Sequence, residues 1–514
     1  MLKKLIKENK IISSILVFFV FVMIFSTKGT TAPLSTSMEV ENYLAKEIIF
    51  IGTPLEFSRA RTHYMQMVAL YNRNTLEFTE HEAFLTRPDA GYLNGKFHSV
   101  AIFGISLFMY PFFFLGTFVG LEQLMSIIPL YSLHGVNIFL FFILLNGLFK
   151  NKALSGAGAL LFGFATLLLP FASSPLYHNF SILFVLTLFL LTKKISESPD
   201  KAFKLFLISS TLIGISVFID YPIPLILLPF YFYQIILLRR QNTPSTQKKT
   251  IKTLLYSFCI AAFCLSGLLF VQNKMFGNPF QMANTQIQYV GKNTVTTFSD
   301  EFLKSRTAEK NSLKKFVNKD NITKNFSRVF IAKDKGLLIL SPILFLAFFG
   351  IFFARKQKIL KPILIPLALS TLISFLLYTA FIGGRGDHSI GIRYMIPLIP
   401  LFLIFVVSAL KEIREVRILR IPLIVGFFWT FFSHFSGLFT TIYSKMGDPF
   451  HKYGIMQYDY LMAEITSSFW FKHVYWGLPL PFYPILLAII ATSLTTYFLY
   501  HEGLPDDQNP KKTS

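Results

Sequence analysis

Cysteine is nearly absent from this chain: only Cys259 and Cys264 occur among its 514 residues. Both lie in one apolar run, so they provide neither a disulfide framework nor the paired spacing of a zinc site, and we expect them to act as small apolar side chains. Charged residues are also few, at 15% of the chain, whereas soluble domains carry roughly 25%. These shortages exclude a disulfide-stapled secreted domain and an ordinary soluble enzyme.

Motifs of several enzyme classes are missing as well. The sequence contains no Walker loop, no Rossmann fingerprint, no His-Glu-x-x-His zinc motif and no nucleophile elbow, so nothing in it indicates nucleotide hydrolysis. The formal net charge is +22, but many basic residues stand between apolar runs, where they act as topology signals. We therefore expect membrane lipids, and no nucleic acid, among the partners.

Apolar residues dominate the composition. Hydrophobic residues make up 53% of the chain and the mean hydropathy is +0.53. They come in runs of about 16 to 24 residues, long enough to cross a hydrocarbon core of about 30 Å as helices. We predict an all-α polytopic membrane protein. The candidate runs are 11–27, 99–119, 126–149, 153–171, 177–192, 203–219, 222–238, 251–272, 335–354, 361–382, 395–410, 421–442 and 481–500.

Short basic connections predict the orientation, because Lys and Arg favour the cytoplasmic side. They fall at 3–10, 150–152, 193–194, 239–249, 355–358 and 411–420. Three apolar runs separate Lys10 from Lys150, yet an even number must cross if both residues are cytoplasmic. We assign run 99–119, which contains Pro111 and two glycines, to a juxtamembrane helix in the outer interface. Twelve spans remain, with both termini inside.

The chain then divides into six segments. They are an uncleaved anchor span (1–27), an outer loop that ends in the juxtamembrane helix (28–125), transmembrane helices (126–272), a second outer loop (273–334), further transmembrane helices with outer loops 383–394 and 443–480 (335–500), and a cytoplasmic tail (501–514). The second outer loop is basic, but at about 60 residues it lies near the length at which the charge rule stops counting. The expected location is the inner, or plasma, membrane, with the active face outside.

Carboxylates gather at the start of the first outer loop. Glu39 and Glu41 fall in the segment 38–50, which is predicted to be a helix with Ser35 or Ser37 as N-cap. A helix dipole favours acidic residues in a first turn whatever their function. A catalytic role and a purely structural role are therefore both possible explanations of these glutamates. Residues two apart diverge by about 200° around a helix. At most one of the two glutamates therefore points into a given cavity.

Further candidates precede the juxtamembrane helix. Asp89 lies in a Pro-Asp-Ala-Gly sequence, where turn formation alone explains an aspartate. Lys96 carries a point charge suited to a phosphate, and His98 can donate to one or shuttle a proton. The alternative for both residues is an interfacial anchor at the lipid headgroups.

Two more positions mark the outer ends of spans. Asp220, followed by Tyr221, can bind a sugar hydroxyl or orient an arginine; equally, it can cap the helix that starts with Pro222. His178 starts another span on the same side, and we interpret it as an interfacial anchor.

The turn 383–394 combines four glycines with Arg385, Asp387, His388 and Arg393. Topology does not favour arginines on the outer face, and bidentate recognition of a lipid-linked phosphate supplies another reason for them. The glycines let backbone N–H groups approach the same anion. A flexible turn with an Arg–Asp pair is the alternative.

The order of these features resembles integral-membrane glycosyltransferases of the GT-C fold, especially the bacterial family 39-like proteins related to protein O-mannosyltransferases and aminoarabinose transferase. One departure is that Val40 separates two carboxylates that the family often carries side by side. The likeness rests on Glu39-Val40-Glu41-Asn42-Tyr43, on Gly95-Lys96-Phe97-His98-Ser99 leading to Met109-Tyr110-Pro111, on Asp220-Tyr221-Pro222, on Phe276-Gly277-Asn278-Pro279-Phe280, on Lys335-Gly336-Leu337-Leu338, and on Gly383-Gly384 followed by Arg393-Tyr394.

The resemblance implies transfer of a sugar from a polyprenyl-phosphate donor to an envelope acceptor (glycolipid, polysaccharide or protein) on the outer face. Members differ in whether they need a divalent metal, and no ligand cluster in the sequence decides it. The other candidate functions are a secondary transporter, which predicts ionisable groups near span centres, and a polymerase or ligase of surface polysaccharide. The implied site comprises Glu39 or Glu41 as base, Lys96, His98, Arg385 and Arg393 at the donor phosphate, and Asp220, Tyr221, Asp387 and His388 at the substrate.

Overall fold

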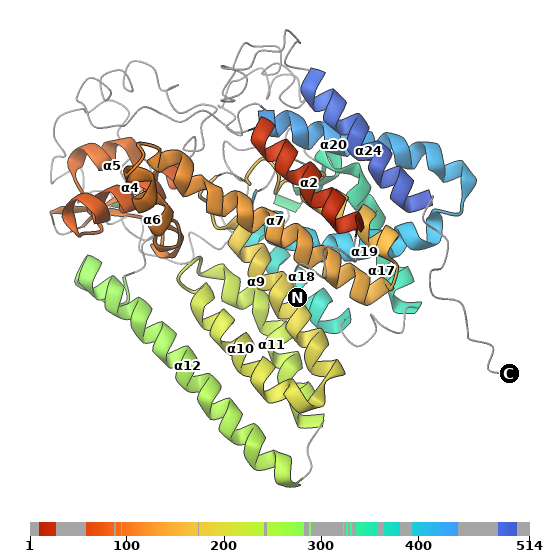
Figure 1. Cartoon of the computed structure of the whole chain (residues 1–514). Coiled ribbons are helices and arrows are strands. Elements are labelled where there is room, and N and C mark those ends of the chain that lie inside the picture. Colours follow the sequence, from red (N-terminus) through yellow and green to blue (C-terminus); the bar gives the residue numbers. More distant parts are fainter. Residues whose placement is uncertain are drawn as a thin grey trace.

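The computed structural model describes residues 10–26, 58–86, 89–93, 95–172, 174–240, 244–281, 287–288, 322, 325–326, 329–331, 336–356, 364–380, 393–439 and 482–500 (Figure 1). Seven helices in these ranges are long and apolar enough to cross a membrane: Glu122–Phe149, His178–Glu197, Pro222–Arg240, Lys248–Phe276, Arg393–Ile413, Arg417–Leu438 and Tyr483–Tyr500. The prediction of a helical integral membrane protein is confirmed in this coarse form. The count of twelve spans and their orientation stay predictions.

Helices make up most of the described chain. Those of the first half are α2 (Lys10–Phe25), α4 (Ser58–Arg73), α5 (Glu80–Thr86), α6 (Gly104–Thr117), α7 (Glu122–Phe149), α8 (Lys152–Phe164), α9 (His178–Glu197), η1 (Pro199–Lys201), α10 (Ala202–Ser216), α11 (Pro222–Arg240) and α12 (Pro244–Phe276). Those of the second half are α16 (Leu337–Leu340), η3 (Pro342–Phe345), α17 (Leu346–Lys356), α18 (Leu364–Ala380), η4 (Arg393–Leu398), α19 (Ile399–Ile413), η5 (Arg417–Leu419), α20 (Arg420–Phe439) and α24 (Phe482–Tyr500).

A small antiparallel sheet accompanies the helices. Its strands β1 (Glu77–Phe78), β2 (Ala90–Leu93), β3 (Lys96–Ser99) and β4 (Ile287–Gln288) follow the order β1-β3-β2-β4. β2 and β3 form a hairpin in which Leu93 pairs with Lys96, and Gly95 supplies the positive φ (79°) that this tight turn requires. Because β4 pairs with β2, the chain near 287–288 meets the first loop on one side of the helix bundle.

Helix α6 occupies the run predicted to lie in the outer interface. The hairpin takes residues up to Ser99, so the helix begins only at Gly104 and has 14 residues. At 1.5 Å per residue it is about 21 Å long, shorter than a hydrocarbon core of about 30 Å. Its place in the interface stays a prediction.

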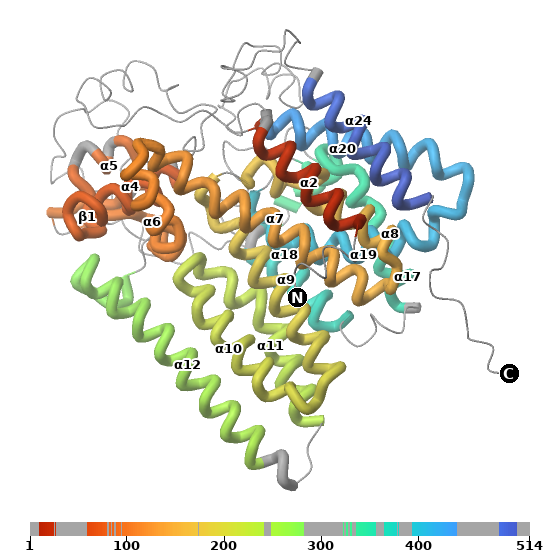
Figure 2. The backbone as a smooth tube through the Cα atoms, in the orientation of Figure 1, coloured from red at the N-terminus to blue at the C-terminus, as the bar shows by residue number. Residues whose placement is uncertain are grey.

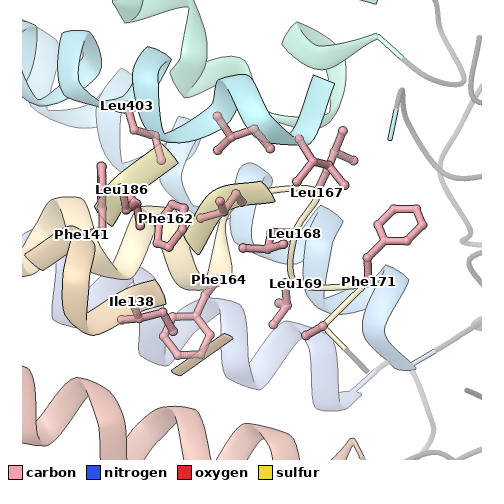
Figure 3. Packing of buried hydrophobic residues seen from close by; sticks show 14 of the residues in the cluster. Ile138, Phe141, Phe162, Phe164, Leu167, Leu168, Leu169, Phe171, Leu186 and Leu403 are labelled. Carbon is pink, nitrogen blue, oxygen red and sulfur yellow. The ribbon is translucent and has the colours of Figure 1, made fainter. Parts of the chain in front are cut away.

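Helix α8 forms the middle of the hydrophobic core and contacts α2, α7, α19, α20 and α24. Every residue from Ala153 to Phe164 is buried, as expected for a helix surrounded by others. Figure 3 shows Phe162 and Phe164 packed with Ile138 and Phe141 of α7 and with Leu403 of α19.

Hydropathy predicts a single helix over the apolar run 153–171. In the structure α8 ends at Phe164. The Thr166 hydroxyl bonds back to the preceding turn, and the chain continues through buried turns. The carbonyl oxygen of Gly163, freed by this break, accepts from Nε2 of His134 at 3.0 Å. Partners of this kind are what permits irregular backbone deep in a helix bundle.

Helix α12 lies at the edge of the bundle beside α10 (Figures 1 and 2). Large side chains such as Phe258, Phe263 and Phe270 are exposed along it. An exposed apolar helix surface of this kind matches the lipid-facing side of a membrane span.

We expect Gly350→Ala to destabilise the protein, because a Cβ at Gly350 of α17 would overlap the carbonyl group of Phe405 in α19. Gly426→Ala in α20 is the control, since a Cβ there meets nothing within 4 Å, and alanine is the better helix former by about 0.5–1 kcal/mol. Thermal unfolding in detergent should give the Gly350 variant a Tm lower by at least about 2 °C. Equal Tm values for the two variants would contradict this packing.

Candidate functional site

Arg59, in the first turn of α4, is the centre of a cluster of charged side chains. Its Nη2 lies 3.3 Å from Oδ1 of Asp89, and its Nη1 donates to the carbonyl oxygen of Val100 at 2.9 Å. The main chain closes the same unit, because the Val100 N–H donates to the Asp89 carbonyl oxygen at 3.1 Å. Both side chains are partly buried, 32% and 13% exposed, so water screens this ion pair less than a surface pair.

Asp220 lies in the turn between α10 and α11, within the electrostatic range of Arg59. Burial raises the pKa of Asp220 to about 7, against the opposing effects of Arg59 and of the Tyr221 N–H, which donates to the carboxylate. The turn is fixed to the start of α6, where the Gly104 N–H donates to the Phe218 carbonyl oxygen at 3.0 Å. A Cβ at Gly104 would overlap that carbonyl group.

Arg393 begins η4 and approaches the cluster from the second half of the chain. Its guanidinium lies 5.2 Å from the ring centroid of Tyr394, and its Nη2 is 3.4 Å from the Tyr394 hydroxyl. Asp89 and Tyr177 act on its charge electrostatically. Four separate stretches of sequence therefore contribute charges that act on one another: the start of α4, the residue before β2, the α10–α11 turn and η4.

Buried hydrogen bonds hold α4 and so fix the position of Arg59. Nδ1 of His63 is 3.1 Å from the Ser106 hydroxyl of α6, and that hydroxyl donates to Oε1 of Gln66. On the other side of α4, Nε of Arg61 donates to the Leu85 carbonyl oxygen at 2.7 Å. Burial, and then Arg59, lowers the pKa of His63 to about 3, so this histidine is neutral at pH 7 and is a hydrogen-bonding group rather than a charge.

Two of the residues predicted from the sequence, Asp220 and Arg393, belong to this cluster. Tyr221 lies beside it, and its hydroxyl accepts from Nε2 of Gln272 in α12 at 2.9 Å. Five predicted residues lie outside the described part of the chain: Glu39, Glu41, Arg385, Asp387 and His388.

Lys96 and His98 lie on the hairpin, and both interact with Glu77. Nζ of Lys96 pairs with Oε1 of Glu77 at 2.6 Å in an exposed ion pair. His98 is buried, with its ring edge-to-face on Phe276 at 5.3 Å, and the charged groups that act on it are Glu77 and Lys96. Burial lowers the pKa of His98 to about 4, so it is neutral at pH 7.

Sequence reasoning missed Arg59 and interpreted Asp89 only as a turn residue. It also interpreted His178 as an interfacial anchor, whereas the side chain is 1% exposed and lies inside the protein. One signal for α4 was available: Arg59, Thr62, His63 and Gln66 recur at helical spacing, which marks a polar stripe. Hydropathy does not tell a buried polar stripe from a solvated one, and the partners of this one come from distant sequence.

Within the described ranges, no three His, Cys, Asp or Glu side chains converge as a metal site would require. Comparison with known proteins adds no relative, since no protein family, curated protein or solved structure matches this chain.

Arg59→Gln is expected to raise the pKa of Asp220 above about 7, because loss of the positive charge disfavours the carboxylate. Infrared titration of the protonated carboxyl band, assigned with Asp220→Asn, measures the midpoint. Arg73→Gln is the matched control, since Arg73 pairs with Glu82 at the other end of α4 at 2.6 Å and should leave the midpoint unchanged. An identical midpoint in all three proteins would show that Arg59 does not act on Asp220.

Proposed function

We propose that this protein is a membrane glycosyltransferase that moves a sugar from a polyprenyl-phosphate donor to an envelope acceptor on the outer face. One observation supports it most: two carboxylates and two guanidinium groups form one set of charges that act on one another. They belong to Asp89, Asp220, Arg59 and Arg393. In such a set a carboxylate can accept the proton that leaves the acceptor, and a guanidinium can stabilise the phosphate that leaves the sugar.

In the proposed reaction an acceptor hydroxyl oxygen attacks the anomeric carbon, and the bond between that carbon and the phosphate oxygen breaks. The bonding electrons leave with the polyprenyl phosphate, whose charge Arg393 stabilises. The acceptor proton passes to a carboxylate. Asp220 suits this role, because its pKa of about 7 is near the operating pH, where a general base is most effective. Glu39 and Glu41 are the other candidates for the base.

The role of Asp220 predicts a pH dependence. Only the deprotonated carboxylate accepts a proton, so the transfer rate should rise with pH through about 7 and fall as Asp220 is protonated below it. Asp220→Asn should lower kcat by roughly 10²–10⁴-fold. The exposed Asp200→Asn, on η1, is the control and should keep the wild-type rate and profile.

The assay uses proteoliposomes, radiolabelled polyprenyl-phosphate sugars and an envelope extract as acceptor, and it follows both labelled product and released polyprenyl phosphate. A Glu39→Gln, Glu41→Gln double variant identifies the base: near-wild-type transfer assigns the role to Asp220, whereas loss of transfer in this variant and not in Asp220→Asn assigns it to the first loop. Absence of transfer by the wild-type protein from pentose, hexose and aminosugar donors alike would contradict the function.

We also propose that the cluster faces the outside, with twelve spans and both termini in the cytoplasm. Asn74, at the end of α4, and Ser196, near the end of α9, are both exposed. In a chain whose two cysteines are replaced by alanine, Asn74→Cys should react with a membrane-impermeant maleimide in intact cells. Ser196→Cys should react only after permeabilisation. The reverse pattern would invert the proposed orientation.

A further inference from the structure

His178 is a buried polar side chain that lacks hydrogen bonds. It is the first residue of α9 and is 1% exposed, and within the described residues neither ring nitrogen has a hydrogen-bond partner. Contacts with the rings of Phe171 (5.3 Å) and Tyr177 (4.4 Å) hold the imidazole in place. An unsatisfied buried polar group costs about 1–3 kcal/mol, so an orphan of this kind indicates a partner other than the described residues.

The amino end of α9 also lacks a side-chain capping partner. α9 has 20 residues, its first turn contains no acidic residue, and its N-cap residue Tyr177 makes no capping hydrogen bond through its side chain. The first N–H groups of a helix have no partner within the helix, and the helix dipole places about half a positive charge there. Residues from His178 to Ile182 are buried, so this positive end points into the protein rather than into water.

Arg393 adds a full positive charge next to the same helix end. η4 packs against α9, and the Arg393 charge acts on His178. Asp89 acts on Arg393 electrostatically and is also ion-paired with Arg59 at 3.3 Å. The phenols of Tyr177 and Tyr394 also act on Arg393 electrostatically.

We propose that the amino end of α9, His178 and Arg393 together bind a phosphate group, with a His178 ring N–H and the first-turn amides as donors. First-turn amides, a ring N–H and a guanidinium together suit an oxyanion with several acceptor oxygens. This inference rests on the proposed function, in which the phosphate is that of the polyprenyl carrier. His178 thereby becomes a donor-binding residue, and α9 the element that orients the leaving group.

The test is binding to the full-length protein in detergent, without acceptor or turnover. The probes are farnesyl phosphate, inorganic phosphate and farnesol, followed by thermal shift and by ³¹P NMR. Farnesyl phosphate should raise the Tm of the wild-type protein, and farnesol should not. His178→Phe should weaken farnesyl phosphate binding about 10- to 100-fold, the effect of one hydrogen bond to a charged group. His434→Phe is the control, because His434 is equally buried but hydrogen-bonds to Ser341 in the core.

Each outcome decides a separate point. Wild-type affinity in a folded His178→Phe variant, or equal stabilisation by farnesol, overturns the site. If the variant does not fold, dipolar dephasing between ³¹P of bound farnesyl phosphate and ¹⁵N-histidine in the wild-type protein takes its place, and absence of dephasing overturns the site. Competition by inorganic phosphate at similar concentration assigns the site to free phosphate rather than to a lipid. Phosphate binding through His178 without sugar transfer would contradict the proposed function but support the phosphate site. Sugar transfer that is unaffected by His178→Phe would support the function but contradict the site.

Discussion

The need to satisfy backbone polar groups inside a helix bundle is the constraint on which this structure depends. It is most demanding where α8 ends at Phe164 and the chain runs on through buried turns as far as Ala172. His134 answers it at the Gly163 carbonyl oxygen. Asn179 donates to the Ala172 carbonyl oxygen at 3.2 Å. Side chains of α7 and α9 thus donate to main-chain carbonyl oxygens around the break.

This break determines where α9 can begin. Nδ2 of Asn137 in α7 donates to the Asn179 carbonyl oxygen at 2.9 Å, which fixes the first turn of α9 against α7. A continuous α8 would leave no chain to return the amino end of α9 into the protein interior. The position of the α9 amino end beside Arg393 therefore follows from the hydrogen bonds that the core forms around the end of α8. The position of the candidate site follows from the same hydrogen bonds.

Much of the fold follows from the sequence, because hydropathy and charge report directly on the solvent each segment prefers. The long helices and the membrane class were predictable for this reason. The end of α8 was not, since the apolar run continues to Phe171 and hydropathy does not distinguish a helix from buried turns. The sheet was also missed, because β1 and β4 have two residues each and acquire their pairing only from distant strands.

The candidate site divides along the same line. Asp220 and Arg393 were predictable, since each stands where an apolar span meets a polar turn and carries a charge that topology does not require there. Arg59 was not, because its sequence surroundings resemble an ordinary polar helix. Its role comes from contacts with Asp89 and Val100, 30 and 41 residues away. The sequence points to a functional polar side chain only when that residue type is unexpected among its neighbours along the chain, as a charge at the end of an apolar span is.

Arg59 also couples the two halves of the proposed reaction. It pairs with Asp89 and acts on Asp220, while Asp89 acts on Arg393, so the base and the phosphate-binding residue belong to one electrostatic network. As the sugar–phosphate bond breaks, negative charge grows on the phosphate beside Arg393. Added negative charge in the network favours the protonated form of a carboxyl group, which strengthens Asp220 as the proton acceptor. Departure of the phosphate and loss of the acceptor proton would then assist each other, which is what a single-displacement transfer requires of its site.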